Sequence, residues 1–415
     1  MRFLVIGSGG REHALVWKLA QEVEVICTPG NPGIAQIAET AHIPASDFEG
    51  IARLVEDREV DLVVVGPEDP LIVGLGDYLR AKGILVYGPN ADGARLEGSK
   101  AWSKELMVAA GVPTAAHGTF LDSNKARDFT RARFAEGRQV AVKASGAALG
   151  KGVVVAETEE QAIDAISMMM DEGGLGEAGK TVVIEDRLTG SEFSLLTMVA
   201  GEHIFSLPIA QDYKRVGDGD QGPNTGGMGT YSPVDWVKDE WVTLTEDQVV
   251  RPLLKELKSR GIDYRGTLFS GLMVDEGRIS CLEYNVRFGD PETQSVMRRL
   301  GRGFAAAIHA CALGEAIPAV EVLDNAAVTV VLASEGYPGS YPKGREISIG
   351  ELPEDVVLFH AGTVLSEGRL VTNGGRVFGV SAIGPTIDQA RKMAYEGILQ
   401  VEFEGAFCRN DIADA

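Results

Sequence analysis

Short apolar runs alternate with amphipathic stretches over the first hundred residues. Each run is four or five residues long and ends at a turn or at a Gly/Pro cluster; the runs are 3–6, 23–27, 61–65 and 84–87. A helical pattern from about Arg11 to Ala20 follows the first run. Strands that alternate with helices indicate parallel βαβ units, which bind ligands beyond the carboxyl ends of their strands. The pattern predicts an N-terminal α/β domain whose Gly/Pro turns meet a ligand.

The pattern changes twice further along. The middle of the chain predicts a helix at 100–110, a helix capped by Thr158, and strands at 140–143, 153–156, 181–185 and 191–199. From about residue 324 the chain predicts short strands and a last helix capped by Thr386. We expect an α/β and α+β multidomain fold: a parallel α/β domain (1–99), a larger central domain (100–323) with a lid subdomain at about 123–190, and a small C-terminal mixed β domain (324–415) that serves for packing.

Composition and charge restrict the partners. Among 415 residues, 60 are acidic and 39 are Lys or Arg, so the formal net charge is −21. This excess disfavours a nucleic-acid or anionic-membrane partner, because both need a basic face. No apolar run approaches the roughly 18 residues of a membrane span. The four cysteines are far apart and predict no disulfide framework, so we expect a cytoplasmic protein.

A glycine-rich turn, Gly7-Ser-Gly-Gly-Arg-Glu-His13, follows the first strand. Backbone N–H groups at such a strand–helix turn suit a phosphate. A dinucleotide site is the weaker interpretation, because Glu12 replaces the third glycine of GxGxxG and the second strand ends in Thr28-Pro29. The alternative is that these glycines only form a turn and bind no ligand.

Three further segments carry the residues of a nucleotide site. Lys143-Ala-Ser-Gly-Ala-Ala-Leu-Gly-Lys-Gly152 joins two strands and is not a Walker loop, but its glycines and lysines can fold over phosphates. Ile184 to Glu192 is a linker rich in acceptors that could hold an adenine and a ribose. Residues 211–229 form a long polar stretch without apolar periodicity, which predicts a functional loop.

A late strand supplies candidate metal ligands. In the segment from Ile279 to Gln294, Glu283, Asn285 and Arg287 would share one strand face at period two. A carboxylate and an amide oxygen suit Mg²⁺, which takes its remaining ligands from water and phosphate. Arg287 would then lie beside the bound phosphate. Together these segments predict an ATP site without a P-loop.

The chain resembles the glycinamide ribonucleotide synthetases, ATP-grasp ligases of purine synthesis, over essentially its whole length. The most specific stretches are GGREHA at 9–14, PGNPG at 29–33, GPE at 66–68, LEGSKA at 96–101, KRVGDGDQGPNTGGMG at 214–229, NVRFGDPETQ at 285–294 and TNGGRV at 372–377. The resemblance implies an ATP-grasp core with an inserted lid. It implies ligation of glycine to 5-phosphoribosylamine through glycyl phosphate, with ATP and Mg²⁺ or Mn²⁺, by a monomer.

The resemblance also implies residue roles. Metal ligands would be Glu283 and Asn285, and Arg287 and Lys143 would be catalytic. Residues expected to bind ATP are Lys100, Lys104, Lys143, Gly146, Gly150, Lys151, Gly152, Glu185, Leu188 and Glu192. Residues expected to bind glycine, the phosphoribosylamine or the transferred phosphate are Gly9, Gly10, Arg11, Glu12, Asn31, Pro67, Glu68, Asp69, Asp212, Lys214, Asn224, Thr225, Gly226, Gly227, Met228, Arg287 and Asp290.

The chain departs from the family pattern in the lid, where Ser145 replaces an acid and Leu149 a small residue, and at Ser270-Gly271, where many ATP-grasp relatives place a further metal carboxylate. Three other functions stay open. Another ATP-dependent carboxylate–amine ligase would differ in the substrate loops. An NAD-linked oxidoreductase is disfavoured by Glu12, and a silent nucleotide-binding protein by the intact Lys143 and Glu283.

Overall fold

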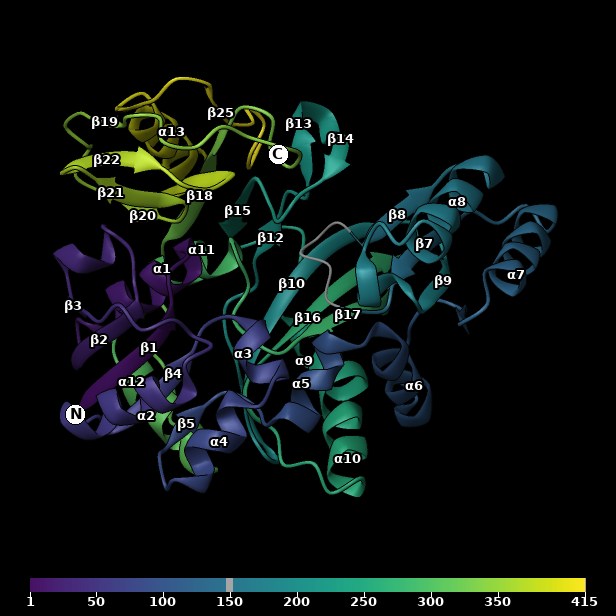
Figure 1. The fold of residues 1–415 in the computed structure, drawn as a ribbon, viewed down its shortest axis with the longest axis horizontal. Coiled ribbons are helices and arrows are strands. Elements are labelled where there is room, and N and C mark those ends of the chain that lie inside the picture. The colour runs from purple at the N-terminus through teal and green to yellow at the C-terminus, as the bar shows by residue number, and fades with distance from the viewer. Residues whose placement is uncertain (147–151, 415) are drawn as a thin grey trace.

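The computed structural model describes residues 1–146 and 152–414 (Figure 1). An all-parallel sheet of order β3-β2-β1-β4-β5 forms the N-terminal domain, as predicted. Its strands are β1 Arg2–Gly7, β2 Glu24–Pro29, β3 Glu39–Thr40, β4 Leu62–Val65 and β5 Val86–Tyr87. Its helices are α1 Gly10–Leu19, α2 Phe48–Asp57, α3 Glu68–Ile72, α4 Leu75–Ala81 and α5 Ala91–Gly98. Because the order reverses at β1, the turn after β1 lies at the switch point of the sheet, where such folds bind ligands.

The central domain is built on an antiparallel sheet of order β11-β10-β16-β17. Its strands are β10 Ser191–Ala200, β11 His203–Ser206, β16 Arg265–Asp275 and β17 Arg278–Asn285. The helices of this part of the chain are α6 Lys100–Ala110, α9 Asp239–Thr245, α10 Arg251–Ser259, α11 Glu292–Arg298 and α12 Phe304–Leu313. Phe193 and Leu195 of β10 enter the same core as α10, whereas Leu196 and Met198 pack with α12. The face that carries Leu196 also carries Glu192 and Ser194, so one end of it is polar.

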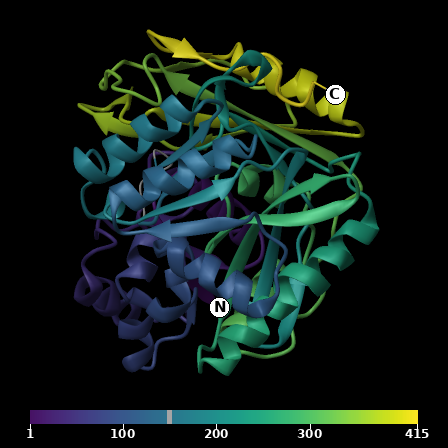
Figure 2. The same ribbon diagram turned by 90° about the vertical axis from the view of Figure 1, so that its right-hand side faces the viewer.

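The lid contains a second antiparallel sheet, of order β6-β9-β7-β8. It has a hydrophobic core of its own. Its elements are β6 His117–Phe120, α7 Ser123–Ala135, β7 Val140–Ala144, β8 Val153–Ala156, α8 Glu159–Ile166 and β9 Val182–Asp186. Thr158 and Gln161 form the predicted capping box at α8. Figure 1 shows the lid projecting from the central sheet, and both Figure 1 and Figure 2 show the C-terminal domain at the top of the molecule.

The C-terminal sheet has the order β12-β15-β18-β23-β20, with β25 also paired to β18. Its strands are β12 Gln211–Asp212, β15 Gly229–Ser232, β18 Ala326–Ser334, β20 Val356–His360, β23 Arg376–Gly384 and β25 Ala406–Phe407. Two small pairs, β19 Ser348–Ile349 with β24 Val401–Glu402 and β21 Thr363–Ser366 with β22 Arg369–Thr372, and α13 Ile387–Ile398 complete the domain. Thus β12 and β15, from the middle of the chain, complete a C-terminal sheet.

The stretch 211–229, predicted as a functional loop, contains more regular structure than a loop would. Between β12 and β15 this stretch forms a hairpin of β13 Arg215–Gly217 and β14 Gln221–Asn224. The C-terminal tail holds its tip, because Asp411 accepts from the N–H of Gly219 at 2.8 Å and Nη1 of Arg409 lies 2.8 Å from Oδ1 of Asp220. The strands are so short and polar that they show no apolar alternation.

The remaining short helical turns are Ile34–Gln36, Ser167–Asp171, Gly176–Gly179, Asp218–Asp220 and Glu246–Val250. In the part of the chain that the structure describes, none of the helices combines the length and the apolar character needed to cross a membrane.

Candidate active site

Two lysines share one buried carboxylate where the lid joins the core. Nζ of Lys143 lies 2.9 Å and Nζ of Lys104 lies 3.1 Å from Oε2 of Glu185. Ala141 pairs with Glu185 and Lys143 with Val183, so the Lys143 and Glu185 side chains project from the same face of the lid sheet. Burial alone would raise the pKa of Glu185, but Lys143 and Lys104 together hold it below its usual value. Two cations against one anion leave a net positive charge, which suits a phosphate.

Ser145 connects the lid to helix α6. Its carbonyl accepts from the N–H of Lys100 at 2.8 Å, and its Oγ accepts from the N–H of Ala101 at 3.1 Å. Both are first-turn N–H groups, which need partners outside the helix. Ser145 therefore fixes the lid strand β7 onto the start of α6, from which Lys100 and Lys104 project one turn apart.

The glycine-rich lid connection is described in part. A Cβ atom at Gly146 would lie 2.6 Å from Cα of Ala178, so the backbone approach there requires glycine. The carbonyl of Gly152 accepts from the N–H of Ala144 at 2.7 Å. The predicted ATP contacts Gly150 and Lys151 lie outside the described residues.

Glu283 and Asn285 lie on β17 at the polar end of the central sheet. In the sheet register Ser194 and Glu283 both pair with Gly271, so these side chains share a face. Burial would raise the pKa of Glu283, but Lys214, Lys143 and Lys100 together hold it below its usual value. An ionised carboxylate beside an amide oxygen is a donor pair that fits Mg²⁺ or Mn²⁺.

Arg287 lies beyond the strand, which ends at Asn285, so its predicted place on a strand face is corrected. Its guanidinium is held between two carboxylates: Nη2 is 2.7 Å from Oε1 of Glu97, and Nε is 3.2 Å from Oε2 of Glu68. Nη2 also lies 3.4 Å from Oδ1 of Asn285. Burial tends to raise the pKa of Glu68, but Arg287 and Arg11 lower it to about 2. The arginine is thus fixed beside the candidate metal ligands.

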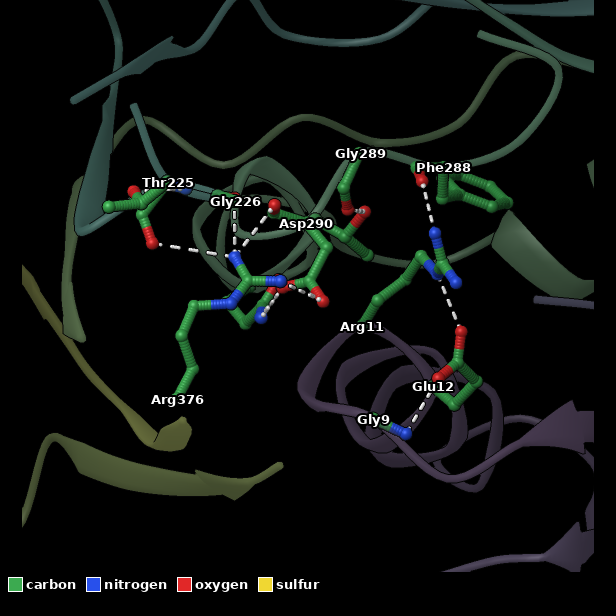
Figure 3. A network of polar contacts seen from close by, with 12 residues as sticks. Gly9, Arg11, Glu12, Thr225, Gly226, Phe288, Gly289, Asp290 and Arg376 are labelled. Carbon is green, nitrogen blue, oxygen red and sulfur yellow. Dashed lines mark hydrogen bonds and ion pairs between the residues drawn. The ribbon is translucent and has the colours of Figure 1, made fainter. Parts of the chain in front are cut away.

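The side chain of Glu12, from the first turn of α1, fills the N-terminal glycine turn. Oε2 of Glu12 accepts from the N–H of Gly9 at 2.7 Å, and Oε1 lies 2.5 Å from Nε of Arg11 (Figure 3). A Cβ at Gly7 would lie 2.3 Å from Cγ of Glu12, and one at Gly66 would lie 2.4 Å from its Oε1. These glycines make room for Glu12 between the ends of β1 and β4. The expectation that the Gly9 N–H is open to a phosphate is therefore corrected.

Asn31 is committed to contacts within the protein. Its Nδ2 donates to the carbonyls of Ser8 at 2.8 Å and His360 at 2.9 Å, and its Oδ1 accepts from the N–H groups of Gly33 and Ile34. The N–H of His360 donates to Nδ1 of His13 at 2.8 Å. Asn31 therefore joins the N-terminal and C-terminal domains behind the turn that carries Gly9 and Gly10.

The polar stretch from 211 to 229 supplies a further cation. Nζ of Lys214 lies 2.5 Å from Oε2 of Glu192. Glu192 belongs to β10, and β16 separates this strand from β17, which carries Glu283. Burial raises the pKa of the adjacent Asp212, although Lys214 opposes this shift. Thr225 accepts from the N–H of Gly227 through its Oγ1 at 2.9 Å, and Met228 is buried. Hence Asn224–Met228 is an ordered turn, and the N–H of Thr225 ties it to Lys214 by donating to the Lys214 carbonyl at 2.7 Å.

Three other predicted site residues, Pro67, Asp69 and Leu188, lie in the segments next to this site. Pro67 precedes α3, and Asp69 is in the first turn of that helix with Glu68. Leu188 lies in the connection from β9 to β10. The structure thus brings Lys100, Lys104, Lys143, Lys214, Glu283, Asn285, Arg287 and Glu68 around one site.

Family models of phosphoribosylglycinamide synthetase match nearly the whole chain. The N domain matches residues 1–97, the ATP-grasp (A) domain 98–293 and the C domain 327–415. The chain belongs to the phosphoribosylglycinamide synthetase family. This result rules out the oxidoreductase interpretation of the Gly7 turn.

Relatives and solved structures agree with the family. Phosphoribosylamine–glycine ligases of Nostoc sp. and Agrobacterium fabrum are 45% and 44% identical to this chain, covering 99% of it and 99% and 98% of their own lengths. A crystal structure of phosphoribosylamine–glycine ligase from Thermotoga maritima has a TM-score of 0.87 at 36% identity and covers 99% of this chain and 100% of its own. A biotin carboxylase domain from Hydrogenobacter thermophilus, at 18% identity, TM-score 0.74 and coverage of 98% of this chain and 91% of its own, shares the fold.

In this member of the phosphoribosylglycinamide synthetase family, sequence reasoning missed two residues of the site. Glu97 holds Arg287, and Arg376 of the C-terminal domain ion-pairs with Asp290 at 2.9 Å. Both lie in stretches that carry the family resemblance, LEGSKA and TNGGRV, and that signal could have drawn attention to them. Arg376 also corrects the view of the C-terminal domain as a packing unit.

Proposed function

We propose that this chain catalyses the ATP-dependent ligation of glycine to 5-phosphoribosylamine, giving glycinamide ribonucleotide, ADP and phosphate. The observation that carries the proposal is the full-length match, at 45% identity, to a ligase of that activity. The arrangement of cations supports it: Lys143 and Lys104 stand on the lid side, and Lys214 and Arg287 on the core side.

The ligation proceeds by two displacements. A glycine carboxylate oxygen attacks the γ-phosphorus of ATP, the bond from that phosphorus to the ADP oxygen breaks, and glycyl phosphate forms. The ribosylamine nitrogen then attacks the acyl carbon, the carbon–oxygen bond to phosphate breaks, and the nitrogen loses a proton. The site needs no covalent nucleophile, because the protein positions the reactants and neutralises their charge.

Residue roles in this proposal follow the contacts. Lys143 and Lys104 hold the phosphates, and their attachment to Glu185 keeps both Nζ atoms oriented. Glu283 and Asn285 would hold Mg²⁺ or Mn²⁺, which when bound neutralises phosphate charge and orients the polyphosphate. Arg287, fixed by Glu97 and Glu68, presents its charge to the transferred phosphoryl group. Lys214 and the turn Asn224–Met228 surround the glycine.

The proposal also covers the domain boundaries, the cellular compartment and the oligomeric state. We divide the chain at 1–99, 100–323 and 324–415. The first boundary is supported by the N-terminal sheet, which lies wholly within 1–99, whereas β12 and β15 of the middle segment pair with the C-terminal sheet. We also propose a cytoplasmic monomer. The four cysteines, Cys27, Cys281, Cys311 and Cys408, are all free, which supports a reducing compartment.

An ADP-release assay tests the function, with ATP, Mg²⁺, glycine and freshly generated phosphoribosylamine. We expect ADP release that depends on both substrates and is lost in Lys143→Met but not in Lys125→Met, a control at an exposed lid lysine. ADP release that prefers another acid or amine would instead support a different carboxylate–amine ligase. ADP release that is independent of either substrate would overturn the proposal.

A further inference from the structure

The first residue of β23 reaches out of the C-terminal domain into the candidate active site. Nη2 of Arg376 lies 2.9 Å from Oδ2 of Asp290, and Nη1 donates to the Asp290 carbonyl at 3.0 Å. Nη1 also donates to the carbonyl of Gly226 and lies 3.4 Å from that of Gly227 (Figure 3). One guanidinium therefore joins the turn Thr225–Gly227 to Asp290, in the turn that follows β17.

A second C-terminal residue holds the same turn. Oη of Tyr337 accepts from the N–H of Gly226 at 2.9 Å. A Cβ at Gly375 would lie 2.2 Å from Cδ2 of Tyr337, so the glycine next to Arg376 is what lets the tyrosine ring take this position. Both main-chain groups of Gly226 are thus bound by side chains of the C-terminal domain.

The two joined turns are also packed against each other. Gly227 has φ +105°, and a Cβ there would lie 2.4 Å from Cδ of Pro291. Asp290 is additionally bound by Nε2 of Gln294 at 2.8 Å. Burial would raise the pKa of Asp290, but Arg376 and Arg11 more than offset this, so the carboxylate stays charged and paired. The turn has little freedom to move while Arg376 is in place.

We propose that Arg376 is a positioning residue for the ligation, which sets the turn Thr225–Gly227 against Asp290, with Tyr337 as a second point of attachment. The proposal rests on the proposed function, because that turn and Asp290 are its expected substrate contacts. A planar guanidinium can serve the three acceptors from Asp290 and Gly226 at once, whereas the single ammonium of a lysine cannot match that geometry. Among the residues that the structure describes, the side-chain hydrogen bonds of Arg376 go to Gly226, Gly227 and Asp290, none of which is assigned to ATP.

Hydrogen exchange and kinetics on the full-length chain test this together. The variants are Arg376→Met, Arg376→Lys and Tyr337→Phe, with Arg369→Met as the control, since Arg369 forms exposed ion pairs with Glu346 and Glu367 in the same domain. In Arg376→Met we expect faster amide exchange at residues 224–229, and a KM for glycine or phosphoribosylamine raised about tenfold or more. The KM for ATP should change by less than about twofold. Arg376→Lys should restore part of the loss, and Tyr337→Phe should show a smaller effect of the same kind.

A double-mutant cycle with Asp290→Asn sharpens the test. If Arg376 acts through Asp290, the double variant should be little worse than the poorer single variant. Additive effects, or an equal rise in the KM values of ATP and both other substrates, would overturn the proposal. So would unchanged exchange at 224–229 in Arg376→Met. The exchange measurement needs no turnover, so failure of the proposed function in the wild type is seen separately from failure of this inference.

Discussion

Oε1 of Glu97 accepts a hydrogen bond at 2.7 Å from Nη2 of Arg287, a residue 190 positions away. The other oxygen of Glu97 accepts from the N–H of Val286 at 2.8 Å. The carboxylate therefore fixes both the Arg287 side chain and the backbone that precedes it.

Glu97→Ala should lower both turnover and stability. It leaves a buried N–H and one arm of a guanidinium without an acceptor, so we expect the free energy of unfolding to fall by about 2–4 kcal/mol. Displacement of Arg287 should lower kcat about tenfold or more. Urea unfolding and ADP-release kinetics measure both. Glu105→Gln, which alters a surface ion pair, is the control; an active and stable Glu97→Ala would contradict the assigned role.

Both lysines that share Glu185 should contribute to the affinity for ATP. Lys143→Met and Lys104→Met each leave one cation on the carboxylate, and we expect ATP binding to weaken about tenfold or more in both. Titration calorimetry with a non-hydrolysable ATP analogue measures this. Lys100→Met tests the remaining lysine of α6. Wild-type affinity in Lys143→Met would remove that residue from the phosphate site.

Divalent metal binding should depend on Glu283. Glu283→Gln removes the negative oxygen of the pair with Asn285, and we expect turnover to fall about a hundredfold or more at saturating Mg²⁺. Binding of Mn²⁺ in the presence of nucleotide, followed by electron paramagnetic resonance, should weaken in parallel. Glu276→Gln, in the exposed turn of the same hairpin, should bind Mn²⁺ normally. Equal Mn²⁺ affinity in both variants would refute the assignment.

Acid should loosen the contact between the N-terminal and C-terminal domains. Burial, reinforced for His13 by His360, lowers the pKa of His13 to about 3, and burial lowers that of His360 to about 4. An unfolded histidine titrates near pH ~6.5, so below that pH the unfolded chain binds more protons than the folded one. The free energy of unfolding should therefore fall as pH drops from about 6.5 toward 4, by about 1.4 kcal/mol per pH unit for each histidine.

Urea unfolding between pH 7.5 and pH 5 measures this loss. In His13→Asn, the Oδ1 atom can accept from the His360 N–H without titrating, so the pH slope should be shallower than in the wild type. His42→Asn changes an exposed histidine and should leave the slope unchanged. A His13→Asn slope equal to that of the wild type would show that the contact is not responsible.

The sequence predicted the local elements well because their signals are local. The strands at Phe3–Ile6 and Leu62–Val65 are continuous apolar runs bounded by turns, and the Thr158 cap needs only a residue three positions away. Lys143 and Glu283 carry the same kind of local signal, and the family resemblance adds to it.

The pairings that the sequence did not predict depend on contacts between segments far apart in the chain. Nothing local to Glu97 indicates that it faces Arg287, and Arg376 and Asp290 are 86 positions apart. The pairing of Gly229 with Val330 is likewise decided by how the sheets pack. A charged residue can pair with any opposite charge that the fold brings near, and sequence spacing does not rank those partners.

Strand β15 has a consequence for how this enzyme can be recombined. By chain position it lies within the central part of the protein, yet it bonds to β18 from Gly229 to Ser232. A C-terminal segment beginning near residue 327, taken alone from a relative, would arrive with the β15 edge of β18 uncovered, and uncovered strand edges invite pairing with other chains. A productive exchange must bring residues 211–232 from the same parent. The C-terminal sheet is thus completed by strands from the middle of the chain, so a single crossover cannot transfer it whole.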